Sequence, residues 1–442
     1  MSVPLHPDMK KITTFAIFIA IALSAPAQET RKLGIAEMFE LIEHNNKDLK
    51  AGKTGVEAAQ EGILAARSQR LPDINAEANV SYIGNALLTD RNFSDVHGLK
   101  SPHFGNQILL DIRQTLYAGG AINAGIRLAD LGAEQSGLGV EQLRQNRRMI
   151  ALGQYLELEK ATNREKVLES NIALTNKLID NIKERYAQGV ALKNDVTRYE
   201  LQLQTLNLNL TKVRNNRSII NHQLCNTLGL VPGTIIDPTD DAAKHLFAKD
   251  GEAHWQTSAS ANSPQLKMAA ISEQIAHQQF KLSQSEMLPK VAFVAQNNFN
   301  GPITFELPPV DKNLNTWFIG VGVQYSLSSL FKSNKRVAQA KFRERQAREQ
   351  RAAAAEQVNN NVQEAYTYYL QSYNELETQQ KNVELARQNY DVINNRYLNQ
   401  LALVTDMVDA SNTKLDAELS EVDARINIAY AYYKMKYVAG EL

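Results

Sequence analysis

Apolar and polar residues alternate in four stretches of the chain. In the clearest stretch Trp317, Ile319 and Val321 share one face, while Gly320 and Gly322 share the other. A period of two residues is typical of a β-strand with one apolar and one polar face. The four predicted strands are 72–83, 106–117, 289–299 and 316–327. The segment 84–105 is rich in Gly, Asn, Asp and Pro, and it is expected to be a loop.

Long helices are expected between and after these strands. Residues 121–187 contain no Pro and residues 332–397 contain neither Gly nor Pro, so each could form about 100 Å of helix at 1.5 Å per residue. Residues 34–70 and 191–228 predict two shorter helices of roughly 55 Å each. Leucines alternate partly with polar residues from 201 to 210, but no turn signal interrupts this region, which favours a helix. Such long helices need coiled-coil packing to be stable in water.

The chain contains an internal repeat. The segments 185–196 and 396–407 share five residue types at an offset of 211: Arg185 and Arg396, Tyr186 and Tyr397, Ala191 and Ala402, Leu192 and Leu403, Asp195 and Asp406. A second match, at an offset of 217, aligns 46–50 with 263–267. Both matches indicate a duplication.

This repeat predicts the domain organisation. We expect a first structural repeat over 28–230, with a β-hairpin at about 72–117, and a second over 263–442, with a hairpin at about 289–327. Residues 231–262 contain Pro and Gly and are expected to form an irregular equatorial connector, with a short helix around 239–247.

The N-terminus has the pattern of an export signal. Met9-Lys10-Lys11 precedes the apolar run Ile12 to Leu23, which is followed by small residues up to Ala27. A positive start, a short apolar core and a small-residue site predict a signal peptide over 1–27. The apolar run is shorter than the roughly 20 residues that a spanning helix needs.

Composition and side-chain chemistry exclude several functions. The 48 basic and 48 acidic residues balance, so nucleic acid is not an expected partner. The single cysteine, Cys225, cannot form an intrachain disulfide, and core packing is its ordinary role. None of the eight histidines has metal-ligand spacing with another on a helix face. We therefore expect no catalytic residue, no cofactor and no metal site, and the protein is not expected to be an enzyme.

Four strands of this length match the length that tilted strands need to cross a bilayer. Four are too few to close a barrel, because the smallest known barrels have 8 strands. Three copies would supply 12 strands around a lumen wide enough to hold water, and their helices could close a tube about 100 Å long. A soluble sheet packed on helices is the alternative, but few helices are available to cover its polar face.

Asp406 and Asp409 lie three residues apart, on one helix face just after the second reversal of the chain. They could simply be favourable charges at a helix start. Alternatively, three chains around an axis would bring six carboxylates together in the narrow end of a tube. Such a ring would attract cations and raise some of the carboxyl pKa values.

These residues resemble the TolC-like outer-membrane efflux channels over about 33–442. The most specific parts are the two Arg-Tyr tips, Leu116-Tyr117-Ala118-Gly119-Gly120 and the run from Val404 to Ala410. The resemblance implies a mainly α fold with a membrane β-barrel. Four strands per protomer would form a 12-stranded barrel in a homotrimer, below which lies a long coiled-coil α-barrel.

The resemblance also implies a function and a location. The protein would be a passive exit duct of a tripartite efflux or type I secretion system, in outer-membrane lipid with a long periplasmic extension. A periplasmic adaptor would contact it, and an inner-membrane pump would act through that adaptor. A periplasmic coiled-coil adaptor and a soluble scaffold remain the alternatives, although neither requires the paired strands.

The resemblance assigns roles to the tips as well. Asp406 and Asp409 would line the closed periplasmic aperture. The tips expected to contact the adaptor are Gly189, Val190, Ala191, Leu192, Leu401, Ala402 and Leu403. Two positions depart from the family pattern. Gln400 replaces a tip glycine, and Lys332-Ser333-Asn334 stands where the second repeat would carry a glycine pair.

Overall fold

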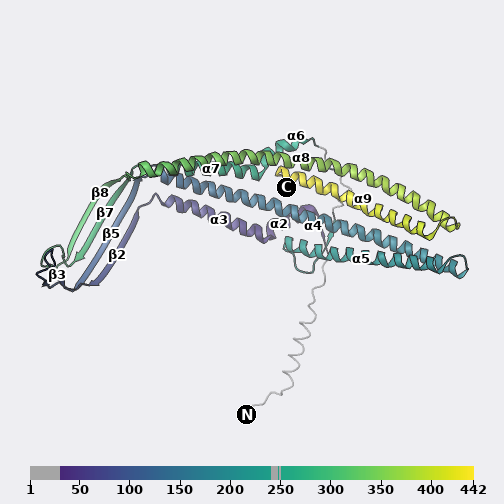
Figure 1. The fold of residues 1–442 in the computed structure, drawn as a ribbon, viewed down its shortest axis with the longest axis horizontal. Helices are drawn as coiled ribbons and strands as arrows, with labels where there is room; N and C mark the ends of the chain where they lie inside the picture. The colour runs from purple at the N-terminus through teal and green to yellow at the C-terminus, as the bar shows by residue number, and fades with distance from the viewer. Residues whose placement is uncertain (1–29, 240–246, 248–249) are drawn as a thin grey trace, which may run out of the picture. The chain divides into compact units, whose positions relative to one another are not determined.

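A computed structural model describes residues 30–239, 247 and 250–442, so the predicted signal peptide lies outside the described residues. The chain forms two compact units. The first comprises residues up to Ala51, Val140–Pro264 and Glu356–Leu442, and the second comprises Gly52–Gly139 and Gln265–Ala355. Most elements of both units are labelled in Figure 1. Each sequence repeat therefore contributes residues to both units.

Three long helices confirm predicted helical segments: α4 (Ala121–Ala187), α5 (Lys193–Leu228) and α8 (Ser329–Leu398). A fourth long helix, α9 (Val404–Ala439), follows the second reversal of the chain. Left-handed glycines end two of them, at Gly229 after α5 and Gly440 after α9. No helix in the described part of the chain combines the length and apolar character needed to cross a membrane.

The predicted single helix over 34–70 is wrong, because the chain forms two helices there. They are α2 (Ile35–Asn45) and α3 (Lys47–Ser68), separated by Asn46. The Asn46 side-chain oxygen accepts hydrogen bonds from the amides of Asp48 and Leu49, at 3.0 and 3.2 Å. Its side-chain nitrogen donates to the Thr227 carbonyl at 3.1 Å. Asn46 thus caps α3 and also joins this break to the end of α5.

The expectation of an irregular connector over 231–262 is also wrong in its last part. Helix α6 (Glu252–Asn262) occupies that part and is followed by α7 (Pro264–Ser285). With 11 and 22 residues, α6 and α7 have the same lengths as α2 and α3, so they are the second copy of that pair. Packing against α9 supports α6, because Trp255 is 2% exposed and its ring meets Tyr432 edge-on. The predicted helix around 239–247 falls almost entirely outside the described residues.

Residues from distant parts of the sequence form the core of the first unit. Strand β1 (Thr30–Leu33) pairs in parallel with β6 (Ile235–Pro238). Beneath this pair, Met38 and Ile42 of α2 pack with Leu152 of α4, and all three are fully buried. The buried Tyr155 hydroxyl donates to the Leu33 carbonyl at 2.9 Å. This core ties the start of the described chain to the middle of α4.

The second unit contains a four-stranded antiparallel sheet. Its strands are β2 (Asp73–Tyr82), β5 (Phe104–Tyr117), β7 (Lys290–Gly301) and β8 (Leu314–Gln324), in that order across the sheet. The pairing of β5 with β7 joins the two predicted hairpins. The segment expected to be a loop contains a short hairpin of β3 (Ala86–Leu88) and β4 (His97–Leu99).

The register gives the sheet one apolar face. Ile74 lies opposite Ile112, which lies opposite Ala295, and Ala295 lies opposite Ile319. The next row across the sheet starts with Asp73 and Arg113 and belongs to the polar face. Within one chain the apolar face is uncovered, with Val80, Trp317 and Val321 each between 64% and 76% exposed.

Candidate functional site

Two turns of the same geometry form the tips of the first unit. At the first, between α4 and α5, the Val190 amide donates to the Arg185 carbonyl at 2.9 Å, and at the second the Leu401 amide donates to Arg396 at 2.8 Å. Gly189 has φ of 78° and Gln400 has φ of 63°. Gln400 therefore adopts the left-handed conformation that glycine favours, and the missing glycine has not changed the turn.

The two tips pack against each other. The Arg185 guanidinium lies 5.6 Å from the centre of the Tyr397 ring, and it donates to the Leu398 carbonyl at 3.2 Å. Between the tips, Ile182 of α4 and Met407 of α9 are almost completely buried in one cluster. The sequence match at the tips thus corresponds to two turns held in contact.

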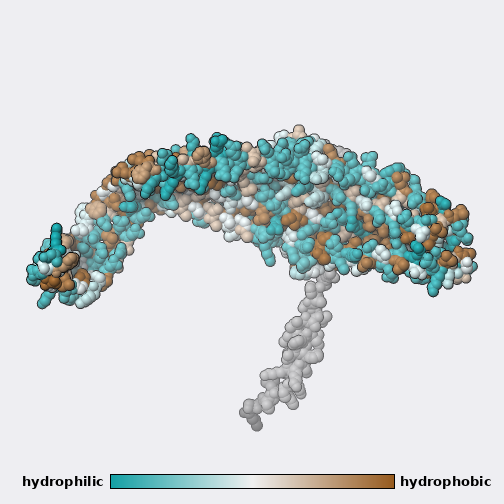
Figure 2. Space-filling model, in the orientation of Figure 1, coloured by the Kyte–Doolittle hydropathy of each residue, from teal (hydrophilic) through white to brown (hydrophobic). Residues whose placement is uncertain are grey.

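Apolar side chains remain exposed at the extreme end of both tips. Leu192, Leu401 and Leu403 are each 68–69% exposed, and Val190 is 48% exposed. Hydrophobic surface is visible at this end of the helices in Figure 2. A cluster of exposed aliphatic side chains is typical of a surface that contacts another protein.

The two aspartates predicted to act together have different surroundings. Asp406 lies in the first turn of α9, where its carboxylate accepts a hydrogen bond from the Leu403 amide at 3.1 Å. Asp195 accepts from the Leu192 amide at the same distance in α5. Asp409 is exposed, and no hydrogen bond or ion pair to it occurs among the described residues. Asp406 therefore stabilises the start of its helix, whereas the carboxylate of Asp409 is available for other interactions.

Tyrosines fill the space behind the tips. Burial raises the pKa of Tyr199 above its ordinary value, and the neighbouring Tyr397 and Tyr390 add to this effect. Burial likewise raises the pKa of Tyr397, with Asp195 acting in the same direction and Arg185 opposing it. Both hydroxyls are therefore neutral at neutral pH.

Polar contacts join the helices above the tips. Both oxygens of Asp423 on α9 accept from Arg164 on α4. Glu418 on α9 accepts from Asn171 on α4 at 3.3 Å and from Arg387 on α8 at 3.1 Å. Three of the long helices are thus joined by hydrogen bonds between charged or amide groups.

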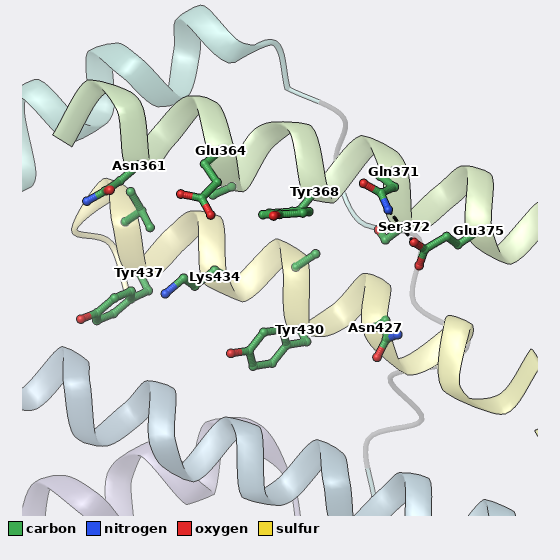
Figure 3. A pocket seen from close by; sticks show the side chains of 13 residues that line it. Asn361, Glu364, Tyr368, Gln371, Ser372, Glu375, Asn427, Tyr430, Lys434 and Tyr437 are labelled. Atoms are coloured by element: carbon green, nitrogen blue, oxygen red, sulfur yellow. Dashed lines mark hydrogen bonds between the residues drawn. The ribbon is translucent and has the colours of Figure 1, made fainter. Parts of the chain in front are cut away.

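An open groove of about 460 Å³ lies between α8 and α9, and the side chains that line it are shown in Figure 3. Tyr368 and Glu364 of α8 face Tyr430 and Lys434 of α9 across it. Tyrosine is enriched where proteins contact each other. The groove contains no histidine or cysteine, and its lining does not suggest a catalytic centre.

Metal and nucleophile chemistry find no support in the described residues. No group of three or more His, Cys, Asp or Glu side chains there could hold a metal ion. Cys225 is 2% exposed and its thiol donates to the Thr234 carbonyl at 3.3 Å, which confirms its predicted place in the core. Burial raises the pKa of this thiol and so disfavours the reactive thiolate.

Comparison with known proteins identifies the family. Residues 39–230 and 255–441 match the family described as outer membrane efflux protein. The chain belongs to this family. Among its relatives, the outer membrane protein TolC of Salmonella enteritidis is 21% identical over 440 residues, covering 98% of this chain and 87% of TolC. The outer membrane efflux protein BepC of Brucella suis is 22% identical over 400 residues, covering 90% of this chain and 83% of BepC.

Solved structures share the fold of this efflux protein. The outer membrane protein VceC of Vibrio cholerae has a TM-score of 0.76 at 16% identity, covering 92% of this chain and 96% of VceC. The CmeC outer membrane channel of Campylobacter jejuni has a TM-score of 0.73 at 14% identity, covering 92% of this chain and 85% of CmeC. The family and these folds confirm the predicted efflux channel, and they do not support the adaptor or scaffold alternatives.

Proposed function

We propose that this efflux protein is the passive outer-membrane exit duct of a tripartite efflux or type I secretion system. Three copies would form one duct, with 12 strands in the outer membrane and the long helices in the periplasm. A periplasmic adaptor would contact the helical tips, and an inner-membrane pump would supply substrate and energy through it. The protein itself would transport without catalysing a reaction.

The two unpaired edges of the sheet are the main observation that supports assembly into a barrel. Strands β2 and β8 are its two edges, so each pairs on one side only within the sheet. An exposed edge strand has unpaired backbone groups that can form hydrogen bonds with a strand of another chain. Because the four strands are antiparallel, β8 of one copy can pair antiparallel with β2 of the next. Repeating this pairing closes a barrel, which removes the edges and places the apolar face in lipid.

The tips support the predicted adaptor contact. Six of the seven predicted residues are aliphatic, and all seven lie on the two turns: Val190, Ala191, Leu192, Leu401, Ala402 and Leu403, together with Gly189. An adaptor hairpin with apolar side chains at its own turn would cover this surface.

The same end of the first unit supports the predicted aperture. In a trimer, one Asp406 and one Asp409 from each copy would bring six carboxylates around the axis. Asp406 remains exposed while it caps α9, and Asp409 is exposed as well. Both carboxylates could therefore face a narrow water-filled opening.

Cysteine cross-linking between the two edge strands tests the assembly. A scan would pair one cysteine in β2 with one in β8, on a background in which the buried Cys225 is replaced by Ala. We expect the cysteine pair that matches the strand register to give a covalent trimer in the membrane fraction. Cysteines placed at Asp111 of the central strand β5 should give no covalent trimer. Recovery of only uncross-linked monomers in the aqueous fraction would contradict the proposal.

A further inference from the structure

A polar pocket lies in the second unit, where strand β8 leads into helix α8. It has a volume of about 340 Å³ and is lined by the ends of β7 and β8, by the link between β8 and α8, and by the first two turns of α8. Nothing in the proposed duct function requires this pocket. It contains the segment Lys332-Ser333 that departs from the family pattern.

The structure also shows that Lys332-Ser333-Asn334 does not stand at the position that corresponds to the glycine pair of the first repeat. Gly119-Gly120 lies in the link between Tyr117, the end of β5, and Ala121, the start of α4. The corresponding link in the second repeat is 325–328, so Lys332-Ser333-Asn334 lies within α8 and does not replace the glycine pair. These residues therefore lie in the first two turns of α8.

Charge in the pocket is predominantly positive. Lys290, Lys332 and Arg336 line it, with Glu286 as its one carboxylate. Glu286 accepts from Arg336 at 3.2 Å. Within the part of the chain that the structure describes, Lys290 and Lys332 have no ion-pair partner. Two positive charges are therefore available to a ligand.

One wall of the pocket contains a buried hydroxyl that has no hydrogen-bond partner among the described residues. Ser329 lines the pocket and is 5% exposed, yet its hydroxyl oxygen has no hydrogen-bond partner. A buried polar group without a partner costs free energy unless a ligand or water supplies one. Ser333, which is 6% exposed, lies one turn further along the same wall.

The start of α8 also favours an anion. The partial positive charge of a helix N-terminus is usually balanced by an acidic side chain, but the first turn of α8 has none and contains Lys332. The amides of Ser329 and Lys332 already donate to carbonyls of the link, at 2.9 and 3.0 Å. Side chains would therefore make the direct contacts, and the helix dipole would add to their field.

Apolar side chains lie beside these charges. Leu327, Leu330 and Phe331 are 70%, 55% and 67% exposed. A ligand with both an anionic group and a hydrocarbon chain would contact both parts of this segment. We propose that the pocket binds the phosphate group of an anionic phospholipid. The lipid source rests on the proposed function, because that function places the ends of these strands at a membrane surface.

Native mass spectrometry of the full-length protein released from defined detergent tests this proposal. Phosphatidylglycerol is expected to be retained in preference to phosphatidylcholine. Replacing both free lysines (Lys290→Gln with Lys332→Gln) should weaken retention of phosphatidylglycerol roughly thirty-fold, since each lysine near a lipid surface contributes about 1 kcal/mol. The matched control is Lys335→Gln, which removes an exposed lysine of the same helix outside the pocket. This control should retain the lipid almost as well as the wild type.

Several results would overturn the proposal. Equal retention by the double variant, or an equal loss in Lys335→Gln, would show that no specific pocket is involved. Inorganic phosphate at millimolar concentration is tested as a second ligand. If free phosphate binds by itself and displaces the lipid completely, the assignment of the ligand as a phospholipid is wrong. The same spectra report the trimer mass, so a trimer without lipid preference refutes only this inference, whereas a monomer refutes the proposed duct.

Discussion

The charge of the tip aspartates can be removed without removing the helix cap. Asp406→Asn with Asp409→Asn replaces both carboxylates but leaves an amide oxygen at position 406. That oxygen can still accept from the Leu403 amide, which Asp406 contacts at 3.1 Å. Alanine at position 406 would instead lose the cap, at a cost of about 1 kcal/mol. The double asparagine variant should therefore form normal trimers.

The effect of this change should appear in cation block. If three copies bring six carboxylates around one opening, a trivalent cation there loses several interactions of about 1 kcal/mol each in the variant. A total loss above about 1.4 kcal/mol corresponds to a more than ten-fold weaker block. Single-channel currents in planar bilayers, titrated with hexamminecobalt from the side of the tips, measure this directly.

A charge further along the same helix provides the control. Asp416 is exposed on α9, about two turns beyond Asp409. Asp416→Asn makes the same change of charge and should leave the block nearly unchanged. An unaltered block in the double variant, or an equal loss in Asp416→Asn, would refute the assignment of Asp406 and Asp409 to the aperture.

Three further predictions concern the turn, an ion-pair network and the sheet. Gln400→Gly should stabilise its turn by about 1 kcal/mol, because glycine adopts a positive φ without strain. Hydrogen exchange of the Leu401 amide should then be slower. The reverse change, Gly189→Gln, should speed hydrogen exchange of the Val190 amide. Burial tends to raise the pKa of Glu165, but the hydrogen bonds and charges of Arg214 and Arg217 lower it overall. The ionised Glu165 should therefore stabilise the folded protein above the unfolded carboxyl pKa of about 4.3, and this stabilisation should be lost as the pH falls through the lower folded pKa. Thermal unfolding at falling pH should show this loss, and Glu165→Gln should remove that part of the pH dependence. Val321→Lys on the apolar face should cost about 2–4 kcal/mol near the bilayer midplane and reduce the yield of heat-modifiable trimer. Thr316→Lys on the polar face should assemble normally. Equal yields of trimer from the two variants would contradict the assignment of these residues to opposite faces of the sheet.

Much of the secondary structure could be read from local patterns. The alternation around Val321 identified a strand and its apolar face, and the absence of Pro and Gly from 332 to 397 identified α8. The paired Arg-Tyr segments located both tips. Each of these signals depends on neighbouring residues, because the periods of strands and helices are set within a few residues of the chain.

Other features depended on distant contacts. Asn46 ends α2 and caps α3, and its side-chain nitrogen donates to the carbonyl of Thr227, 181 positions away. Trp255 and its neighbours in α6 show little helical periodicity, and the helix is supported by packing on α9. The candidate pocket was missed for the same reason, since Lys290 and Lys332 are brought together by two strands and a link.

Local patterns along the chain were enough to predict two related halves, each with a strand pair and a long helix ending in an Arg-Tyr tip. The folded structure was needed to show that β5 pairs with β7, that the Asp406 carboxylate accepts a helix-start hydrogen bond while Asp409 has none among the described residues, and that Gln400 adopts a left-handed conformation. The physical reason is the range of the interactions. Periodicity records which side of an element is buried, whereas pairing, capping and pocket formation depend on groups that meet only when the chain has folded.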